Sequence, residues 1–124
     1  MNEEVQLYFN KAQDCVKDAE LLLGAHRPSA VVGRCYYAMF HAASAMLLDK
    51  EIKRHSHQGL ISAFGQFFVK QGLIDAKFHK YITEAFDLRQ ESDYQPMTEI
   101  SEKQAGKLLE RAKEFLDACR KLCK

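Results

Sequence analysis

Apolar residues recur with helical spacing in most of the chain. At 3–23, 56–70, 76–91 and 101–122 they return every third or fourth position, as on one face of an amphipathic helix. The segment 28–48 differs because it is apolar nearly all round, which is typical of a buried central helix. No segment keeps the strict alternation of a strand. The sequence therefore predicts an all-α, up-and-down bundle of five helices.

Residues that favour helix ends stand at several of these boundaries. Pro28 suits the first turn of the central helix, where a missing amide hydrogen costs little. Ser56 and Asp75 can cap the third and fourth helices, and residues 101–104, SEKQ, have the form of a capping box. The third helix is the weakest prediction because it contains two glycines. We interpret these glycines as points where helices approach closely.

A narrow polar strip runs along the otherwise apolar central helix. At 100° per residue, Arg34, Tyr37, His41 and Ser44 fall on one face. Burying such groups without partners is costly, so they need an explanation. They could bond to other helices or face a second copy of the chain. The alternative is that Arg34, Tyr37 and His41 bind a ligand or nucleic acid.

Two further groups of residues are candidates for function. Arg89 is in register with the apolar stripe of the fourth helix, so it needs either a carboxylate or a ligand. Asp93 follows at the spacing of a helical ion pair, and Tyr94 lies in the next turn. A basic loop is interpreted either as solvated or as a contact for phosphate or an acidic partner; its candidate residues are Lys53, Arg54, His55 and His57.

The overall charge limits these hypotheses. The chain has 124 residues and a net charge of +1, with basic and acidic residues balanced in each half. We therefore predict a single domain over residues 1–124, and any nucleic-acid binding must be local. No segment has the layout of a signal peptide, and Arg34 and His41 interrupt the longest apolar run. These features predict a cytoplasmic protein with no membrane span.

Motifs for catalysis or metal binding are absent from the sequence. It contains no glycine-rich phosphate loop, no HExxH and no nucleophile elbow. Its cysteines form no CxxC pair, so we expect free thiols that face the core; they are Cys15, Cys35, Cys119 and Cys123. We expect neither a metal nor a cofactor.

Three features in order resemble the HEPN domain, a small helical bundle of prokaryotes. They are the central helix RCYYAMFHAASAMLL, the following KRHSHQGLISAFGQFFVKQGLI, and LRQESDY before the last helix. The resemblance spans nearly the whole chain. It is closest to the stand-alone HEPN proteins with an R-x-x-x-D-Y motif. It implies a bundle that forms a homodimer and that often works beside a small nucleotidyltransferase in toxin–antitoxin systems.

The resemblance also implies roles for residues. In nuclease members an arginine is followed by four to six residues and a histidine, which activates a ribose 2′-hydroxyl. Arg89 matches the arginine and Tyr94 a tyrosine of related motifs, but Asp93 stands near the place of the missing histidine. An aspartate, with an ordinary pKa of about 3.9, is a weak base at neutral pH. We therefore expect no robust ribonuclease activity from the protein alone.

Histidines at two other places in the sequence are weaker candidates for catalysis. Arg34 and His41 have R-x6-H spacing but lie in the wrong helix, and His55 and His57 are expected on a mobile loop. The favoured function is thus a dimeric partner of a nucleotidyltransferase that contacts nucleotide or RNA through Arg89 and Arg34. The alternative is a degenerate or unorthodox ribonuclease toxin, and the third is a scaffolding role.

Overall fold

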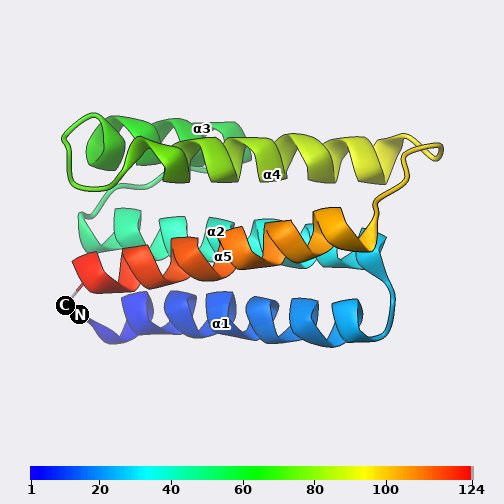
Figure 1. Cartoon of the computed structure of the whole chain (residues 1–124). Coiled ribbons are helices and arrows are strands. Elements are labelled where there is room, and N and C mark those ends of the chain that lie inside the picture. The colour runs from blue at the N-terminus through cyan, green and yellow to red at the C-terminus, as the bar shows by residue number, and fades with distance from the viewer. Residues whose placement is uncertain (124) are drawn as a thin grey trace.

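The computed structural model describes residues 1–123. Its five α-helices are joined by short connections, and a π-helical turn, η1, continues the third (Figure 1). The described residues contain no strand, which confirms the all-α prediction. The bounds are α1 Glu3–Gly24, α2 Pro28–Asp49, α3 His57–Phe64, η1 Gly65–Val69, α4 Ala76–Tyr94 and α5 Glu102–Leu122.

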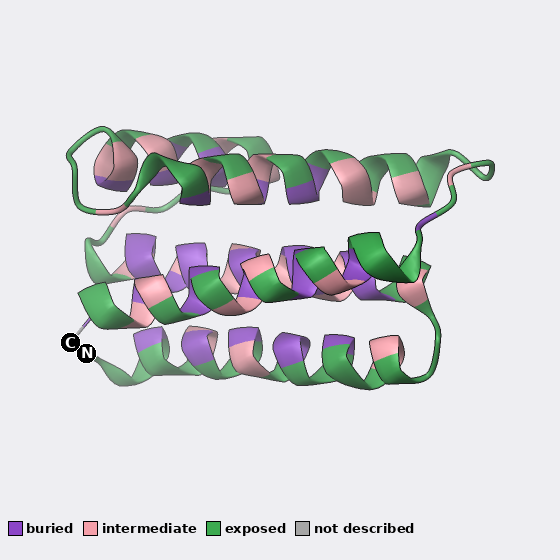
Figure 2. Ribbon diagram, in the orientation of Figure 1, coloured by how far each residue is buried: buried purple, intermediate pink, exposed green. Residues whose placement is uncertain are grey.

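Helix α2 is the centre of the bundle. It packs against each of the other four helices. Figure 1 shows α1 on one side of it and the α3–α4 pair on the other, with α5 running alongside α2 between them. The buried surfaces of all five helices turn towards this centre (Figure 2), and the fully buried side chains of α2 include Tyr36, Met39 and Met46. This burial supplies the main favourable contribution to folding.

Side-chain caps begin three of the helices as predicted. The Ser56 hydroxyl accepts a hydrogen bond from the Gly59 amide, and the Asp75 carboxylate accepts one from Lys77, each at 2.9 Å. Ser101 and Gln104 form the reciprocal bonds of a capping box, both at 3.0 Å. These bonds satisfy amides that have no partner within the helix.

The third and fourth helices differ from their predicted forms. The segment 56–70 is a short α-helix followed by the π-helical turn η1. Gly65, the first residue of η1, lies so close to α4 that an added Cβ would sit 2.9 Å from the His79 ring. This confirms a close approach at that glycine. Helix α4 extends to Tyr94 instead of ending at residue 91, so Asp93 and Tyr94 belong to its last turn.

Other features of the described residues bear on function. All four cysteines are buried, free thiols. Within residues 1–123, no helix combines the length and apolar character needed to cross a membrane. In the same part of the chain, no three His, Cys, Asp or Glu side chains are grouped so that they could hold a metal ion.

Candidate functional site

One face of α2 is only partly covered by the rest of the bundle. Between residues 31 and 47 most of α2 is buried, whereas one set of positions along its length is half-buried. At 100° per residue these positions lie within an arc of about 120°, so they form one continuous strip. We call this strip the open face of α2; it consists of Gly33, Arg34, Tyr37, Phe40, His41, Ser44 and Leu48. It contains the four polar residues of the predicted strip, together with Phe40 and Leu48, which were not predicted to lie there.

Two arginines from different helices surround Tyr37. The guanidinium carbon of Arg34, on α2, lies 5.5 Å from the centre of the Tyr37 ring. That of Arg89, on α4, lies 5.1 Å from the same ring and 5.8 Å from the ring of Tyr36. These are cation–π distances, which hold the two guanidinium groups next to one phenol. The structure thus brings Arg34, Tyr37 and Arg89 together, although 55 residues separate the arginines.

The two arginines differ in how their charges are compensated. Arg89 Nε lies 3.3 Å from Asp93 Oδ2, with side chains 24% and 49% exposed. This pair is the predicted one, but it is partly exposed, and it is made through Nε. Within residues 1–123, Arg34 has no carboxylate within 4.0 Å; its one side-chain hydrogen bond is a weak one, from Nη1 to Cys15 Sγ at 3.9 Å. Arg34 is therefore a half-buried cation without a counter-ion.

His57 occupies a different place from the mobile loop expected for it. It is the first residue of α3, and its Nδ1 lies 2.6 Å from the hydroxyl of the fully buried Tyr36. Its ring stacks on Phe40 at 4.6 Å and lies 6.1 Å from Phe86 on α4. Burial, with a smaller effect of the Arg89 charge, lowers the pKa of His57 below the usual value. A fixed, neutral imidazole therefore stands beside the Arg89 guanidinium.

His41 lies further along the open face, towards α1. Its ring is 6.0 Å from Tyr37 and 6.4 Å from Tyr8 of α1. Its Nδ1 is the one buried side-chain polar atom in residues 1–123 that has no hydrogen-bond partner. Burial lowers the pKa of His41, and the charges of Lys11 and Arg34 act in the same direction.

The rest of the basic loop lies at the other end of the open face. Lys53, Arg54 and His55 line a hollow of about 230 Å³, together with Ser44 and Leu48 of the open face. His57 instead packs against Tyr36 and Phe40, near Arg89. The structure therefore separates His57 from the other three residues of the predicted basic loop. Tyr94 belongs to neither: it is 77% exposed in the last turn of α4.

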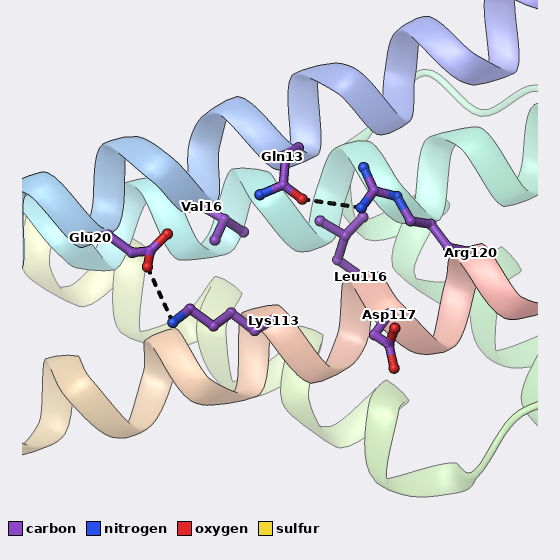
Figure 3. Close-up of a pocket in the computed structure, with 7 residues that line it drawn as sticks. All are labelled: Gln13, Val16, Glu20, Lys113, Leu116, Asp117 and Arg120. Atoms are coloured by element: carbon purple, nitrogen blue, oxygen red, sulfur yellow. Dashed lines mark hydrogen bonds and ion pairs between the residues drawn. The ribbon is translucent and has the colours of Figure 1, made fainter.

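A separate hollow lies between α1 and α5, and its two cations bond to side chains of α1. Figure 3 shows Lys113 paired with Glu20 at 3.3 Å and Arg120 donating to Gln13 at 3.1 Å. Val16 and Leu116 supply its apolar lining. Because these cations already have partners within the chain, this hollow is a weaker candidate for an anion site than the open face of α2.

Comparisons with known proteins identify the family of this chain. The family model for the HEPN domain matches residues 5–122. A "UPF0332 protein" of Thermotoga maritima is 35% identical, over 98% of this chain and 95% of its own. Two proteins of Methanocaldococcus jannaschii, each named "Putative toxin", are 32% and 33% identical; they cover 100% and 95% of this chain, and this chain covers 92% and 80% of theirs.

These matches extend over the helices that position the site. Helices α2, α3 and α4, which supply Arg34, His57 and Arg89, all lie within the matched residues. The predicted resemblance is thereby confirmed over nearly the whole described bundle. The chain belongs to the HEPN domain family.

Proposed function

We propose that this protein binds the phosphates of nucleotide or RNA on the open face of α2, as the toxin-like component of a module with a small nucleotidyltransferase. The observation that carries this proposal is the pair of guanidinium groups around Tyr37, one of them without a carboxylate. A half-buried cation is stabilised when an anion approaches it.

The arginine chemistry suits phosphate in particular. A guanidinium donates two parallel hydrogen bonds to a phosphate, and such charge-assisted bonds are stronger than neutral ones. Asp93 approaches Arg89 through Nε, and the guanidinium has four further N–H donors on its terminal nitrogens. The near-zero net charge of the chain is compatible with this proposal because the positive charge is concentrated locally.

Family membership supports the partner and assembly parts of the proposal. Two relatives of this chain bear the name "Putative toxin". The resemblance to HEPN domains implies a dimer that works beside a nucleotidyltransferase. The open face of α2 presents Tyr37 and Phe40 only half-covered in a single chain, which favours a homodimer built near this face. Growth arrest on expression, together with relief by a nucleotidyltransferase found encoded beside the gene, would support the module. No relief by that enzyme would contradict it.

Fluorescence anisotropy with a labelled single-stranded RNA tests the binding itself. Arg34→Gln and Arg89→Gln should each weaken binding at least several-fold, since each removes a phosphate contact. The matched control is Arg111→Gln: Arg111 also lies over a tyrosine, 4.6 Å from the Tyr81 ring, but it is paired with Glu84. Equal affinity for wild type and both open-face variants would refute the proposal.

A further inference from the structure

The basic loop after α2 lines a hollow that the proposed phosphate site does not use. Lys53, Arg54 and His55 are exposed around this hollow of about 230 Å³, which we call the basic hollow. Neither arginine of the proposed phosphate site lines it. What it binds is therefore a separate question from phosphate binding.

The cations of the basic hollow have no counter-ions. Within residues 1–123, neither Lys53 nor Arg54 has a carboxylate within 4.0 Å. The Arg54 guanidinium donates to the Lys53 carbonyl at 2.7 Å, but this acceptor is neutral and leaves the charge unbalanced. Glu4 of α1 also lines the hollow, so the lining holds two cations, one histidine and one carboxylate. The excess of positive charge favours an acidic partner.

The deeper part of the basic hollow is aliphatic. Leu48, Ile52 and Leu60 line it from α2, the loop and α3; Leu60 is 6% exposed and the other two are half-buried. Tyr8 is the one aromatic residue in this lining among the residues described. Single-stranded nucleic acids bind through bases stacked on aromatic side chains, whereas apolar hollows at protein surfaces receive the anchor side chains of other proteins. The lining therefore favours a protein partner.

A second hollow continues the first along α1. Glu4 and Tyr8 line both, and Leu7 and Lys11 complete the second, which has a volume of about 200 Å³. Leu7 is apolar yet 55% exposed, and Lys11 has no carboxylate within 4.0 Å in residues 1–123. The start of α1 and the connection from α2 to α3 lie at the same end of the bundle (Figure 1). The two hollows form one surface, the basic trough, with cations at both ends and apolar side chains between them.

The loop that carries Lys53 and Arg54 begins from a fixed backbone. The amides of Glu51 and Ile52 bond to the carbonyls of Leu48 and Leu47, at 2.8 and 2.9 Å respectively. These bonds, with Glu51 in the left-handed region at φ 60°, are those that close the end of a helix. A surface that is ordered before binding loses less conformational freedom when a partner arrives.

We propose that the basic trough binds an acidic amphipathic segment of a partner protein. Apolar side chains of the segment occupy the two hollows, and its carboxylates lie against Lys53 and Arg54 at one end and Lys11 at the other. An amphipathic helix that lays its apolar face in a groove recognises partners in this way. The trough is concave, whereas binding to a bilayer uses apolar side chains that project from the protein. The inference goes beyond the proposed function and does not depend on phosphate binding.

Peptide display on the full-length protein tests this inference. A library of random peptides of about 16 residues, or roughly four helical turns, is selected on wild type, and the enriched peptides are synthesised with a fluorescent label. We expect them to combine aspartate or glutamate with apolar residues at helical spacing. Lys53→Gln/Arg54→Gln should weaken their binding at least about five-fold, because two charge contacts are lost. The matched control, Lys70→Gln/Lys103→Gln, removes the same charge from exposed positions outside the trough and should bind like wild type.

A second pair of variants tests the apolar contact. Leu7→Ser should weaken binding of the same peptides at least about five-fold, because a leucine that the segment covers is lost. Leu21→Ser is the matched control: Leu21 lies on the same helix, is 74% exposed and does not line the trough, so its variant should bind like wild type. Circular dichroism should show that these surface variants retain the fold.

The inference is overturned if no peptide is enriched, if the enriched peptides lack acidic residues, or if Lys53→Gln/Arg54→Gln binds them as tightly as wild type. It is also overturned if this double variant loses affinity for single-stranded RNA, or for phosphatidylserine/phosphatidylcholine vesicles, while its affinity for the peptides is unchanged. The loop would then serve a nucleic acid or a membrane. RNA binding by Arg34→Gln and Arg89→Gln is measured in parallel, so failure of the proposed function and failure of this inference are seen separately.

Discussion

Removing the Tyr36 hydroxyl tests the contact that positions His57. Tyr36→Phe deletes one oxygen from a side chain that is 0% exposed and bonded to His57 Nδ1 at 2.6 Å. The ring keeps its aromatic neighbours, including Tyr37 at 5.2 Å and Phe86 at 5.6 Å, so little packing is lost. A hydrogen bond of this kind contributes about 0.5–1.5 kcal/mol net. His57 is only half-buried, so its freed nitrogen does not carry the full desolvation penalty. We therefore expect a loss of about 1 kcal/mol.

Urea denaturation followed by circular dichroism at pH 7.5 measures this loss. In a chain of this size, a loss of about 1 kcal/mol in the free energy of unfolding lowers the melting temperature by roughly 3–5 °C. Tyr37→Phe is the matched control, because the Tyr37 hydroxyl makes no hydrogen bond within residues 1–123; its effect should stay below about 0.5 kcal/mol. Unchanged stability of Tyr36→Phe, or an equal loss in Tyr37→Phe, would show that the Tyr36–His57 bond does not hold the site.

Three other expectations follow from the same geometry. Asp93→Asn should lower the free energy of unfolding by less than about 1 kcal/mol, because its pair with Arg89 is partly exposed; a loss above about 2 kcal/mol would mean that the pair is buried. Burial lowers the pKa of both His41 and His57, so the unfolded chain binds protons first on acidification. The contribution of these histidines to stability should be fully present above about pH 6.5 and should be lost as the pH falls through their pKa values in the folded state. If the double variant His41→Gln/His57→Gln shows the same pH dependence of stability as wild type, this reasoning is wrong. Light scattering at tens of micromolar should give twice the chain mass of 14.2 kDa, and a monomer would exclude the homodimer.

Helical periodicity was sufficient to predict the fold. The number of helices, their order and the polar strip of α2 all follow from spacing, because apolar residues must face one common core. Spacing also identified the i, i+4 pair of Arg89 and Asp93, which the structure confirms. Some local details did not follow. His26, which is not a glycine, takes the left-handed conformation after α1, since its amide is bonded back to Leu23 of the helix.

The site was harder to predict than the fold because it joins residues that are far apart in the sequence. No local pattern in the sequence indicates that His57 lies near Arg89 or that it bonds to Tyr36. Both contacts depend on how α3 and α4 pack on α2. One signal in the sequence does indicate the place of His57. Ser56 is predicted to cap the third helix, and the residue after a cap belongs to the helix and not to the loop. A histidine in a capped first turn is better ordered than one in an open loop.

The salt dependence of RNA binding tests the central claim most directly, because it counts phosphate contacts. For single strands the logarithm of the binding constant falls with the logarithm of salt concentration by about 0.7 per contact. The double variant Arg34→Gln/Arg89→Gln should therefore bind with a slope that is shallower than that of wild type by about 1.4, that is, two such contacts. Arg111→Gln should keep the wild-type slope. An unchanged slope in the double variant would contradict phosphate binding at the open face of α2.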